Sequence, residues 1–439
     1  MSALAVSTSV FKWQKKWLWL ATLLPLLFIS DILYGGLEYY GIQFQVTPGV
    51  VLRGMVVLIA IYMTMHYWHL VDKPLLIWIT FMSLSVLPSI LVGIFRGGNF
   101  FYDVSALSKV LYLPLVTGLF VALVKVYDLR MDDILRFIEY GAYVLGVSLL
   151  ISQKLGIQKQ TYGDYAFGST GIFYAQNDMT LALGLGLLSG GYLFVMMRFS
   201  WLRLWLLAMS SFACVQIGTR ASLAAVVGTA LTAILCVIWG KTEGRGIGAA
   251  DRIKKWLAGF FMLVIMSGIL VYGLTKQQEF SYQQQKLEEV ASGDFPRLLL
   301  VLAGAEQISN RAAIFDFVGE GADAFQRGVA RYFPKAEKKR MVEVDWMDIF
   351  GGYGIGFTIL IHLFVVLVLL KSSLRFVIKR GSCYGLIAAA TLFYLGHSAI
   401  AGHALTSPIP STLMAGYLSI FFTNKVFSSS HDFNVNTSE

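Results

Sequence analysis

The sequence predicts an all-α polytopic membrane protein with about twelve transmembrane helices and a large extracytoplasmic loop between the ninth and the tenth. Apolar residues make up 56% of the 439 residues and charged residues only 14%, and the mean hydropathy is +0.66. The apolar runs approach the roughly 20 residues that a helix needs to cross about 30 Å of hydrocarbon. One long polar stretch interrupts them late in the chain, so chemistry outside the bilayer is expected to depend largely on this stretch.

The predicted spans set the organisation of the chain. They cover residues 17–34, 49–70, 74–95, 106–127, 134–152, 172–195, 201–217, 221–240, 256–274, 348–370, 383–402 and 409–423. The resulting parts are a cytoplasmic N-terminus (1–16), helices one to nine (17–275), the large loop (276–347), helices ten to twelve (348–424) and a cytoplasmic tail (425–439). The first apolar run is too long for a removable signal peptide and lacks a cleavage site of small residues, so we expect it to be retained.

Lysines and arginines gather in every second connection between the predicted spans. Residues 241–255 and 371–380 carry the largest groups, whereas the short connections of the other kind, such as 35–48, carry few or none. By the positive-inside rule, both termini lie in the cytoplasm and the large loop lies on the outer side of the membrane. The net charge of +9 then reflects orientation and attraction to anionic membrane lipid. It gives no specific support for nucleic-acid binding.

The interiors of the predicted spans offer little chemistry. Cys214, Cys236 and Cys383 lack metal-binding or CxxC spacing, so we expect them to be small packing residues. The sequence has no nucleotide-binding motif, and the relay of carboxylates expected of an ion-coupled carrier is missing. Polar groups collect instead at the outward ends of the spans. These groups are Arg53, Arg96, Lys109, Lys154, Lys159, Asp178, Arg220 and His403.

Two arginines at the outward side are candidate ligand-binding residues. Arg220 lies in a tight turn, where it can snorkel to lipid headgroups or grip a lipid-linked phosphate with its guanidinium fork. Arg311 is predicted to lie in the first turn of an amphipathic helix capped by Ser309 or Asn310. The helix dipole disfavours a cation there, which favours a ligand role over a structural one. The leucine-rich segment 296–308 before it can lie on the membrane surface.

Three carboxylates, Glu343, Asp345 and Asp348, precede a glycine-rich helix start. They either stabilise the positive end of that helix or act as a general base or sugar ligand. The glycines of residues 351–356 permit a helix break or a close helix contact. His403, in the last outward turn, is either hydrogen-bonded to backbone or part of the same site.

These stretches together resemble the O-antigen polymerase and O-antigen ligase superfamily. Thr219 to Ser222 is similar to its T-S-R-G/A element, and residues 173–178 are similar to its F-x-x-P-N element, with Gln176 in place of the proline and Asn177 retained. Residues 310–315 look like the arginine segment that opens the large loop. Residues 343–348 with the glycines that follow resemble the E-x-D-x-x-D ending of the loop in polymerase-type members.

The resemblance implies a glycosyltransferase that needs no metal and no cofactor. Its substrate would be an undecaprenyl-diphosphate-linked oligosaccharide at the outer face of the cytoplasmic membrane. Arg220 and Arg311 would neutralise the diphosphate leaving group, and one of Glu343, Asp345 and His403 would act as base. The residues expected to contact substrate are Lys159, Gln176, Asn177, Trp346, Asp348 and Tyr353.

The resemblance favours a polymerase over a ligase. Ligases carry a His-Asn pair at the end of the large loop, where this chain has Glu343 to Trp346. The product would be O-antigen, capsule or exopolysaccharide, and the partners would be a flippase and a chain-length regulator. Three alternatives remain: ligase-type transfer to another acceptor, a flippase or exporter of lipid-linked saccharide, and a non-catalytic membrane subunit.

Overall fold

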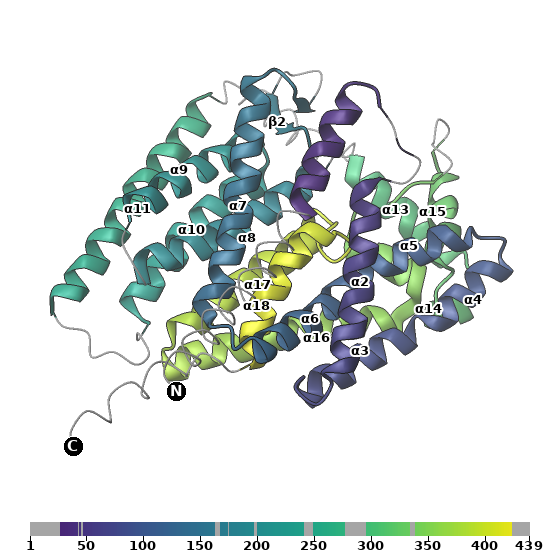
Figure 1. The fold of residues 1–439 in the computed structure, drawn as a ribbon. Coiled ribbons are helices and arrows are strands. Elements are labelled where there is room, and N and C mark those ends of the chain that lie inside the picture. The colour runs from purple at the N-terminus through teal and green to yellow at the C-terminus, as the bar shows by residue number, and fades with distance from the viewer. Residues whose placement is uncertain are drawn as a thin grey trace, which may run out of the picture.

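The computed structural model describes residues 27–42, 44, 47–162, 167–173, 175–196, 200–240, 249–276, 296–333 and 339–423. Helices dominate, and the first covers residues 27–39. The others are α2 (Pro48–His66), α3 (Lys73–Ser85), α4 (Leu87–Phe95), α5 (Phe100–Val110), α6 (Tyr112–Val126), α7 (Met131–Lys154), α8 (Gln176–Met196), α9 (Trp201–Gln216), α10 (Arg220–Ile238), α11 (Ala249–Lys276), α13 (Pro296–Ser309), α14 (Ile314–Val318), α15 (Ala322–Ala330), α16 (Asp345–Lys379), α17 (Ser382–Ile400) and α18 (Pro408–Thr423) (Figure 1). The expected cytoplasmic termini, 1–16 and 425–439, lie outside the described residues.

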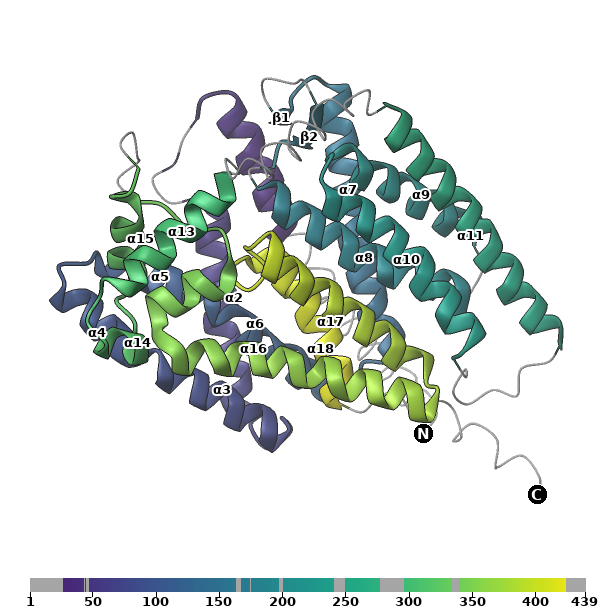
Figure 2. The same ribbon diagram turned by 180° about the vertical axis from the view of Figure 1, so that it is seen from behind.

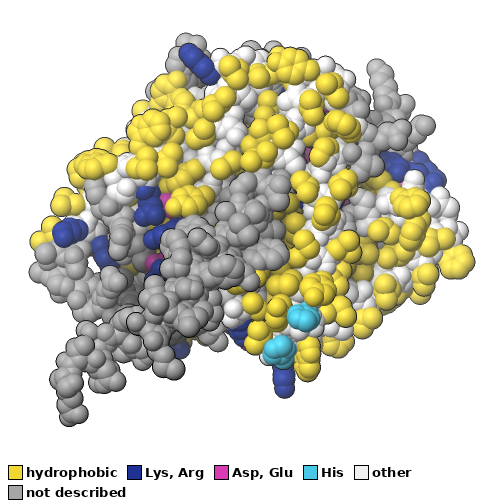
Figure 3. Space-filling model, viewed as in Figure 1, with side chains coloured by type: hydrophobic (Ala, Val, Ile, Leu, Met, Phe, Trp, Pro, Cys, Tyr) yellow, Lys and Arg dark blue, Asp and Glu magenta, His cyan; other side chains and the backbone are white. Residues whose placement is uncertain are grey.

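Long apolar helices agree with the predicted membrane class. In the described part of the chain, eight helices are long and apolar enough to cross a membrane, or nine if the bent pair α5 and α6 is one span. Each predicted span overlaps a described helix, but α9 and α18 have only 16 residues, so the count of twelve stays a prediction. Figure 3 shows hydrophobic side chains over much of one face, as expected of helices that border lipid.

Two features depart from a bundle of straight helices. Strands β1 (Lys159–Tyr162) and β2 (Phe167–Gly171) form an antiparallel hairpin where the sequence predicts only a loop. The predicted fourth span is two helices, α5 and α6, that meet at 50°. Pro114 in the first turn of α6 explains the break, because proline lacks an amide hydrogen and its ring clashes with the carbonyl four residues earlier.

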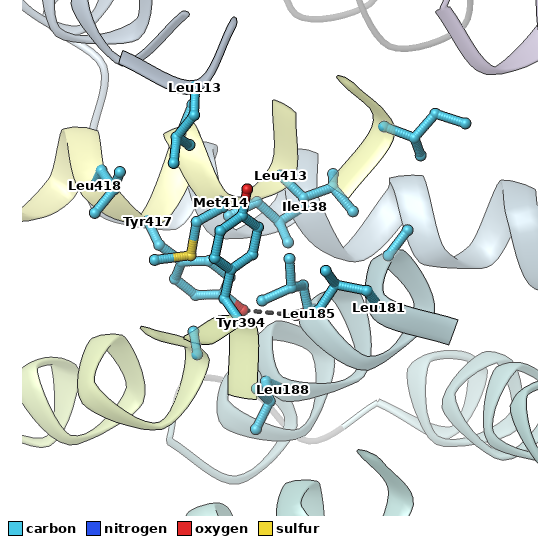
Figure 4. Packing of buried hydrophobic residues seen from close by; sticks show 14 of the residues in the cluster. Leu113, Ile138, Leu181, Leu185, Leu188, Tyr394, Leu413, Met414, Tyr417 and Leu418 are labelled. Atoms are coloured by element: carbon cyan, nitrogen blue, oxygen red, sulfur yellow. Dashed lines mark hydrogen bonds between the residues drawn. The ribbon is translucent and has the colours of Figure 1, made fainter. Parts of the chain in front are cut away.

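Helix α8 is the centre of the bundle. Its side chains from Met179 to Met196 are all buried, and it contacts α7, α9, α10, α11, α17 and α18. Glycines permit the close approach, since a Cβ on Gly186 would lie 2.1 Å from the Cβ of Ala142 on α7. Figure 4 shows the packing, in which Tyr417 of α18 donates a 2.7 Å hydrogen bond to the carbonyl oxygen of Leu185. The middle of the bundle is therefore filled with side chains.

Residues 296–333 and 339–344 form a compact segment that we call the cap. The cap contains α13, α14 and α15 and lies against α4, α5 and the start of α16 (Figures 1 and 2). A small apolar core joins it to α16. This core consists of Leu300, Ala303, Phe325, Val329, Val342, Val344 and Met347. We call the end of the bundle that carries the cap the cap side.

Polar contacts fix the cap onto α5. Asp103 accepts a 2.8 Å hydrogen bond from the amide of Asp323, which in turn accepts a 3.0 Å hydrogen bond from the amide of Asn99. Burial raises the pKa of Asp323, but hydrogen bonds from Lys339 and Asn99 outweigh burial, so the pKa is lowered overall. The carboxylate is therefore charged at neutral pH, and the cap is held by a mixture of apolar packing and ionic contacts.

Helix α16 is broken near its start, as the glycine run permits. Gly354 has φ 78° and ψ 175°, which interrupts the helical hydrogen bonds. The carbonyl oxygens of Gly351 and Gly352 instead accept hydrogen bonds from the amides of Glu320 (3.1 Å) and Gly321 (3.0 Å) of the cap. The break thus joins the membrane helix to the cap.

Candidate functional site on the cap side

Asp345 holds the turn between α17 and α18. Its Oδ2 accepts hydrogen bonds from the amides of Ala404 (2.8 Å) and Leu405 (2.9 Å) and from the hydroxyl of Ser398 (2.8 Å). Its Oδ1 accepts a 3.3 Å hydrogen bond from Thr406. The side chain is 1% exposed. Asp345, predicted as a candidate base, is therefore a structural anchor in this arrangement.

Glu343 and His403, the other two base candidates, both have a left-handed backbone. Their φ values are 64° and 62°, which is uncommon outside glycine and recurs at functional sites. The carbonyl oxygen of Glu343 packs against Gly402, where a Cβ would lie 2.2 Å away. The segment before α16 and the turn that carries His403 are therefore in direct contact.

Asp348 is the carboxylate of this group that lines a cavity. Its Oδ1 accepts a 2.9 Å hydrogen bond from the amide of Val342, and its Oδ2 accepts a 3.0 Å bond from the amide of Glu343. These two bonds fix the carboxylate in place. The cavity measures about 60 Å³ and lies between α5, α15 and α16. Its other polar lining residues are Tyr102, Ser105, Lys109, Gln326, Tyr353 and Thr406.

Tyr353, predicted to bind substrate, also lines this cavity. Its side chain is 4% exposed, and its hydroxyl has no hydrogen-bond partner among the described residues. A buried polar group without a partner is costly, so it is a sign of a ligand or a bound water.

The start of α8 contacts the turn between α17 and α18. Asn177 donates a 3.1 Å hydrogen bond to the carbonyl oxygen of Ala401, and Ser407 donates a 2.5 Å hydrogen bond to Asp178. The side chain of Asn177, predicted to bind substrate, thus binds the backbone at the end of α17 in this structure. Asp178 also interacts electrostatically with His403.

The start of α10 lies beside α8. The hydroxyl oxygens of Thr180 and Thr219 are 3.1 Å apart. Thr219 is the N-cap of α10 and accepts a 3.1 Å hydrogen bond from the amide of Ser222. Arg220, the first residue of α10, is exposed at this point. The structure therefore places Arg220 on the cap side, near the first turn of α8.

Arg311 lies in the turn before α14, and the prediction of a place in the first helical turn is wrong. Helix α14 starts at Ile314. The Arg311 side chain is 1% exposed; its Nε donates a 2.9 Å hydrogen bond to Asp316, and its Nη1 donates a 3.1 Å bond to the carbonyl oxygen of Gly351. Nη1 also lies 3.6 Å from the Glu320 carboxylate. The carboxylates of Asp316 and Glu320 and the carbonyl oxygen of Gly351 thus stabilise the positive charge of Arg311, which the dipole of α14 alone would disfavour.

The two arginines consequently have different surroundings. Helices α10 and α14 lie well apart in Figures 1 and 2. The convergence of Arg220 and Arg311 on one diphosphate, which the resemblance implies, stays a prediction. Within the protein, Nε and Nη1 of Arg311 donate hydrogen bonds, whereas its buried Nη2 lies 2.9 Å from Asp316 but has no hydrogen-bond partner among the described residues.

Three more predicted substrate contacts lie at the edge of this region. Lys159 forms a 2.8 Å ion pair with Glu38. Gln176, half-buried, is the first residue of α8. Trp346, the second residue of α16, is 44% exposed, so its ring is available for contact with lipid or with a sugar.

Sequence reasoning missed most of the cavity wall. Tyr102 and Gln326 are 224 positions apart, yet their side chains share a hydrogen bond. Nothing local in the sequence marks either residue. For Lys109 a weak signal exists, because it is one of the basic residues at the outward end of a predicted span.

The sequence matches the family described as O-antigen ligase like membrane protein over residues 12–291, more than half of the chain. The chain belongs to the O-antigen ligase-like family. This membership points to a membrane enzyme of glycosyl transfer that acts on lipid-linked saccharides. No curated protein matches the sequence.

The family match covers only part of the cap side of this O-antigen ligase-like protein. Arg220, Asn177 and the α5 wall of the cavity lie within residues 12–291, whereas the cap and α16 lie beyond them. The cavity therefore joins the part of the chain that defines the family to a part that the match does not cover.

Proposed function

We propose that this O-antigen ligase-like protein is a polysaccharide polymerase. It transfers a saccharide from undecaprenyl diphosphate to a sugar hydroxyl of a second lipid-linked repeat unit. The cap side faces the periplasm, and the product is O-antigen, capsule or exopolysaccharide. A flippase supplies the repeat units, and a chain-length regulator acts with the enzyme. The reaction uses no metal and no nucleotide sugar.

The observation that carries this proposal is the fixed carboxylate of Asp348 in a cavity beneath the cap. The acceptor hydroxyl gives its proton to Asp348 as its oxygen bonds to the anomeric carbon. The bond between that carbon and the phosphate oxygen breaks, and undecaprenyl diphosphate leaves with the electron pair. Asp345, whose oxygens accept four hydrogen bonds, positions the neighbouring turn for this step.

Arg220 is the arginine that we assign to the diphosphate. It is exposed on the cap side within the family match, and a guanidinium fork suits phosphate oxygens. Negative charge grows on the leaving diphosphate in the transition state, so a cation there lowers the barrier.

Two alternatives are less well supported. A flippase needs a polar path through the bundle, whereas α8 is buried along Met179–Met196 and α18 along Pro408–Phe421. Ligase-type transfer gains some support from His403, which interacts electrostatically with Asp348. The acidic residues 343–348, in place of a His-Asn pair, favour the polymerase.

Surface polysaccharide made in cells that carry Asp348→Asn separates the three functions. We expect a loss of at least a hundredfold in polymer, because a general base contributes about 10²–10⁴ in rate. Single repeat units should remain on the surface. Polymer that accumulates on its lipid carrier would indicate a ligase, and repeat units trapped inside the cell would indicate a transporter.

Asp132→Asn is the matched control. It removes the same charge in the first turn of α7, at the end of the bundle away from the cap, where Asp132 is half-buried. We expect this variant to make polymer of normal length and amount. An Asp348→Asn protein that behaves like Asp132→Asn would exclude Asp348 as the base.

A further inference from the structure

Lys109 lies where the cavity meets the membrane helices. It belongs to the last turn of α5, two residues before the bend into α6. From α5, Lys109 lines the same cavity as Asp348 and Tyr353, which belong to α16. A cation is thus placed on a cavity that already contains a fixed carboxylate.

Lys109 has no carboxylate within salt-bridge distance among the described residues. Three other cations of the cap side form ion pairs. Arg53 lies 2.5 Å from Asp31, Lys159 lies 2.8 Å from Glu38, and Arg96 lies 2.5 Å from Glu320. Lys109 interacts with Asp178 only at longer range, and Arg53 repels it. A partly enclosed ammonium in this position favours an anion from outside the protein.

A second observation points to a ligand at the same place. The hydroxyl of Tyr353 is buried and has no partner among the described residues, although a phenol can donate to a phosphate oxygen. Asp348 lines the same cavity but forms no ion pair with Lys109, and its oxygens accept hydrogen bonds from the amides of Val342 and Glu343. The cavity of about 60 Å³ is several times the roughly 15 Å³ that one water needs, which suits a group the size of a phosphate.

We propose that Lys109 and Tyr353 bind a diphosphate oxygen of the lipid-linked substrate. This assignment rests on the proposed function and adds a ligand from α5 that the family resemblance does not imply. Lys109 contributes a point charge and Tyr353 a hydrogen bond. Lys109 and Asp348 line one cavity without forming an ion pair with each other. In the proposed reaction the ammonium of Lys109 binds the leaving diphosphate, and the carboxylate of Asp348 accepts the proton of the acceptor hydroxyl.

Binding of undecaprenyl diphosphate to the purified full-length protein in phosphatidylcholine nanodiscs tests this site. We expect Lys109→Ala to raise Kd by roughly tenfold, and Lys109→Arg and Tyr353→Phe by about threefold each, as for charge-assisted and neutral hydrogen bonds. Lys154→Ala is the matched control, since Lys154 is an exposed lysine in the last turn of α7 that does not line the cavity. An unchanged Kd for Lys109→Ala would overturn the proposal.

Two further arms complete the test. Phosphatidylglycerol added to the nanodiscs should not compete at equal concentration; equal competition would show a site for lipid headgroups and would also overturn the proposal.

Thermal unfolding monitors folding, and Lys109→Met, which keeps the aliphatic chain, replaces Lys109→Ala if the melting temperature falls. If the unsubstituted protein binds undecaprenyl diphosphate through Lys109 but makes no polymer, the binding site stands and the polymerase function is rejected. If the unsubstituted protein makes polymer but Lys109→Ala leaves Kd unchanged, only the binding site is rejected.

Discussion

At the residue scale, neighbouring carboxylates have different roles because their surroundings differ. Asp345 and Asp348 lie one helical turn apart. Asp345 accepts hydrogen bonds from three donors in the turn between α17 and α18 and from one donor on α17, whereas Asp348 is held by two backbone amides and lines a cavity. Sequence spacing predicts that such residues are close together. It cannot predict which of them remains available to a substrate.

Arg311 provides a test at this scale. Arg311→Ala should lower the free energy of unfolding by about 1–3 kcal/mol, because it removes the buried hydrogen bonds to Asp316 and Gly351, while Glu320 keeps its ion pair with Arg96. The melting temperature of the purified protein and the protease resistance of the cap should fall together. Arg331→Ala, an exposed change at the end of α15, is the control. An Arg311→Ala protein with normal stability and weakened diphosphate binding would support the ligand role instead.

At the element scale, two helix breaks shape the cap side. The bend between α5 and α6 follows from Pro114, and the break in α16 follows from Gly354. The glycine run predicted that a break was permitted, and the structure shows one. Which glycine breaks the helix depends on the cap, since a Cβ on Gly354 would lie 2.3 Å from the carbonyl oxygen of Phe317. That contact is 37 positions away along the chain, beyond the reach of local patterns.

Gly354→Ala tests the break. The backbone at φ 78° and ψ 175° is almost restricted to glycine, so we expect a loss of stability on the order of 1–3 kcal/mol, with a cap that proteases cleave faster. Gly356→Ala is the control two residues later, where a Cβ would meet nothing within 4 Å. It should leave stability unchanged or raise it by up to about 1 kcal/mol. Equal behaviour of the two variants would contradict the role given to the break.

At the scale of the whole molecule, orientation in the membrane comes from charge and is independent of the packing. The distribution of lysine and arginine predicts that the cap side faces the periplasm. The structure adds that the cap, the cavity and the starts of α8, α10 and α16 share one end of the bundle. A single topology experiment therefore assigns a side of the membrane to every candidate residue.

Cysteine labelling in spheroplasts measures this orientation. Ala305→Cys, exposed on α13, should react with a membrane-impermeant maleimide, whereas Lys73→Cys, exposed at the start of α3, should react only after lysis. Labelling of the native cysteines should be low because Cys214, Cys236 and Cys383 are all buried. The reverse pattern would place the cap in the cytoplasm and reject the proposed reaction at the periplasmic face.

The sequence alone determined the membrane class, the family and the positions of most helices, because hydrophobic length and short motifs are local properties of the chain. It also indicated that carboxylates, an arginine and a histidine gather on one side. Only the tertiary structure decided that Arg311 is enclosed by Asp316 and Glu320 and that Lys109 shares a cavity with Asp348 and Tyr353. Those neighbours come from distant segments, and the electrostatic environment of a side chain depends on what packs around it after folding.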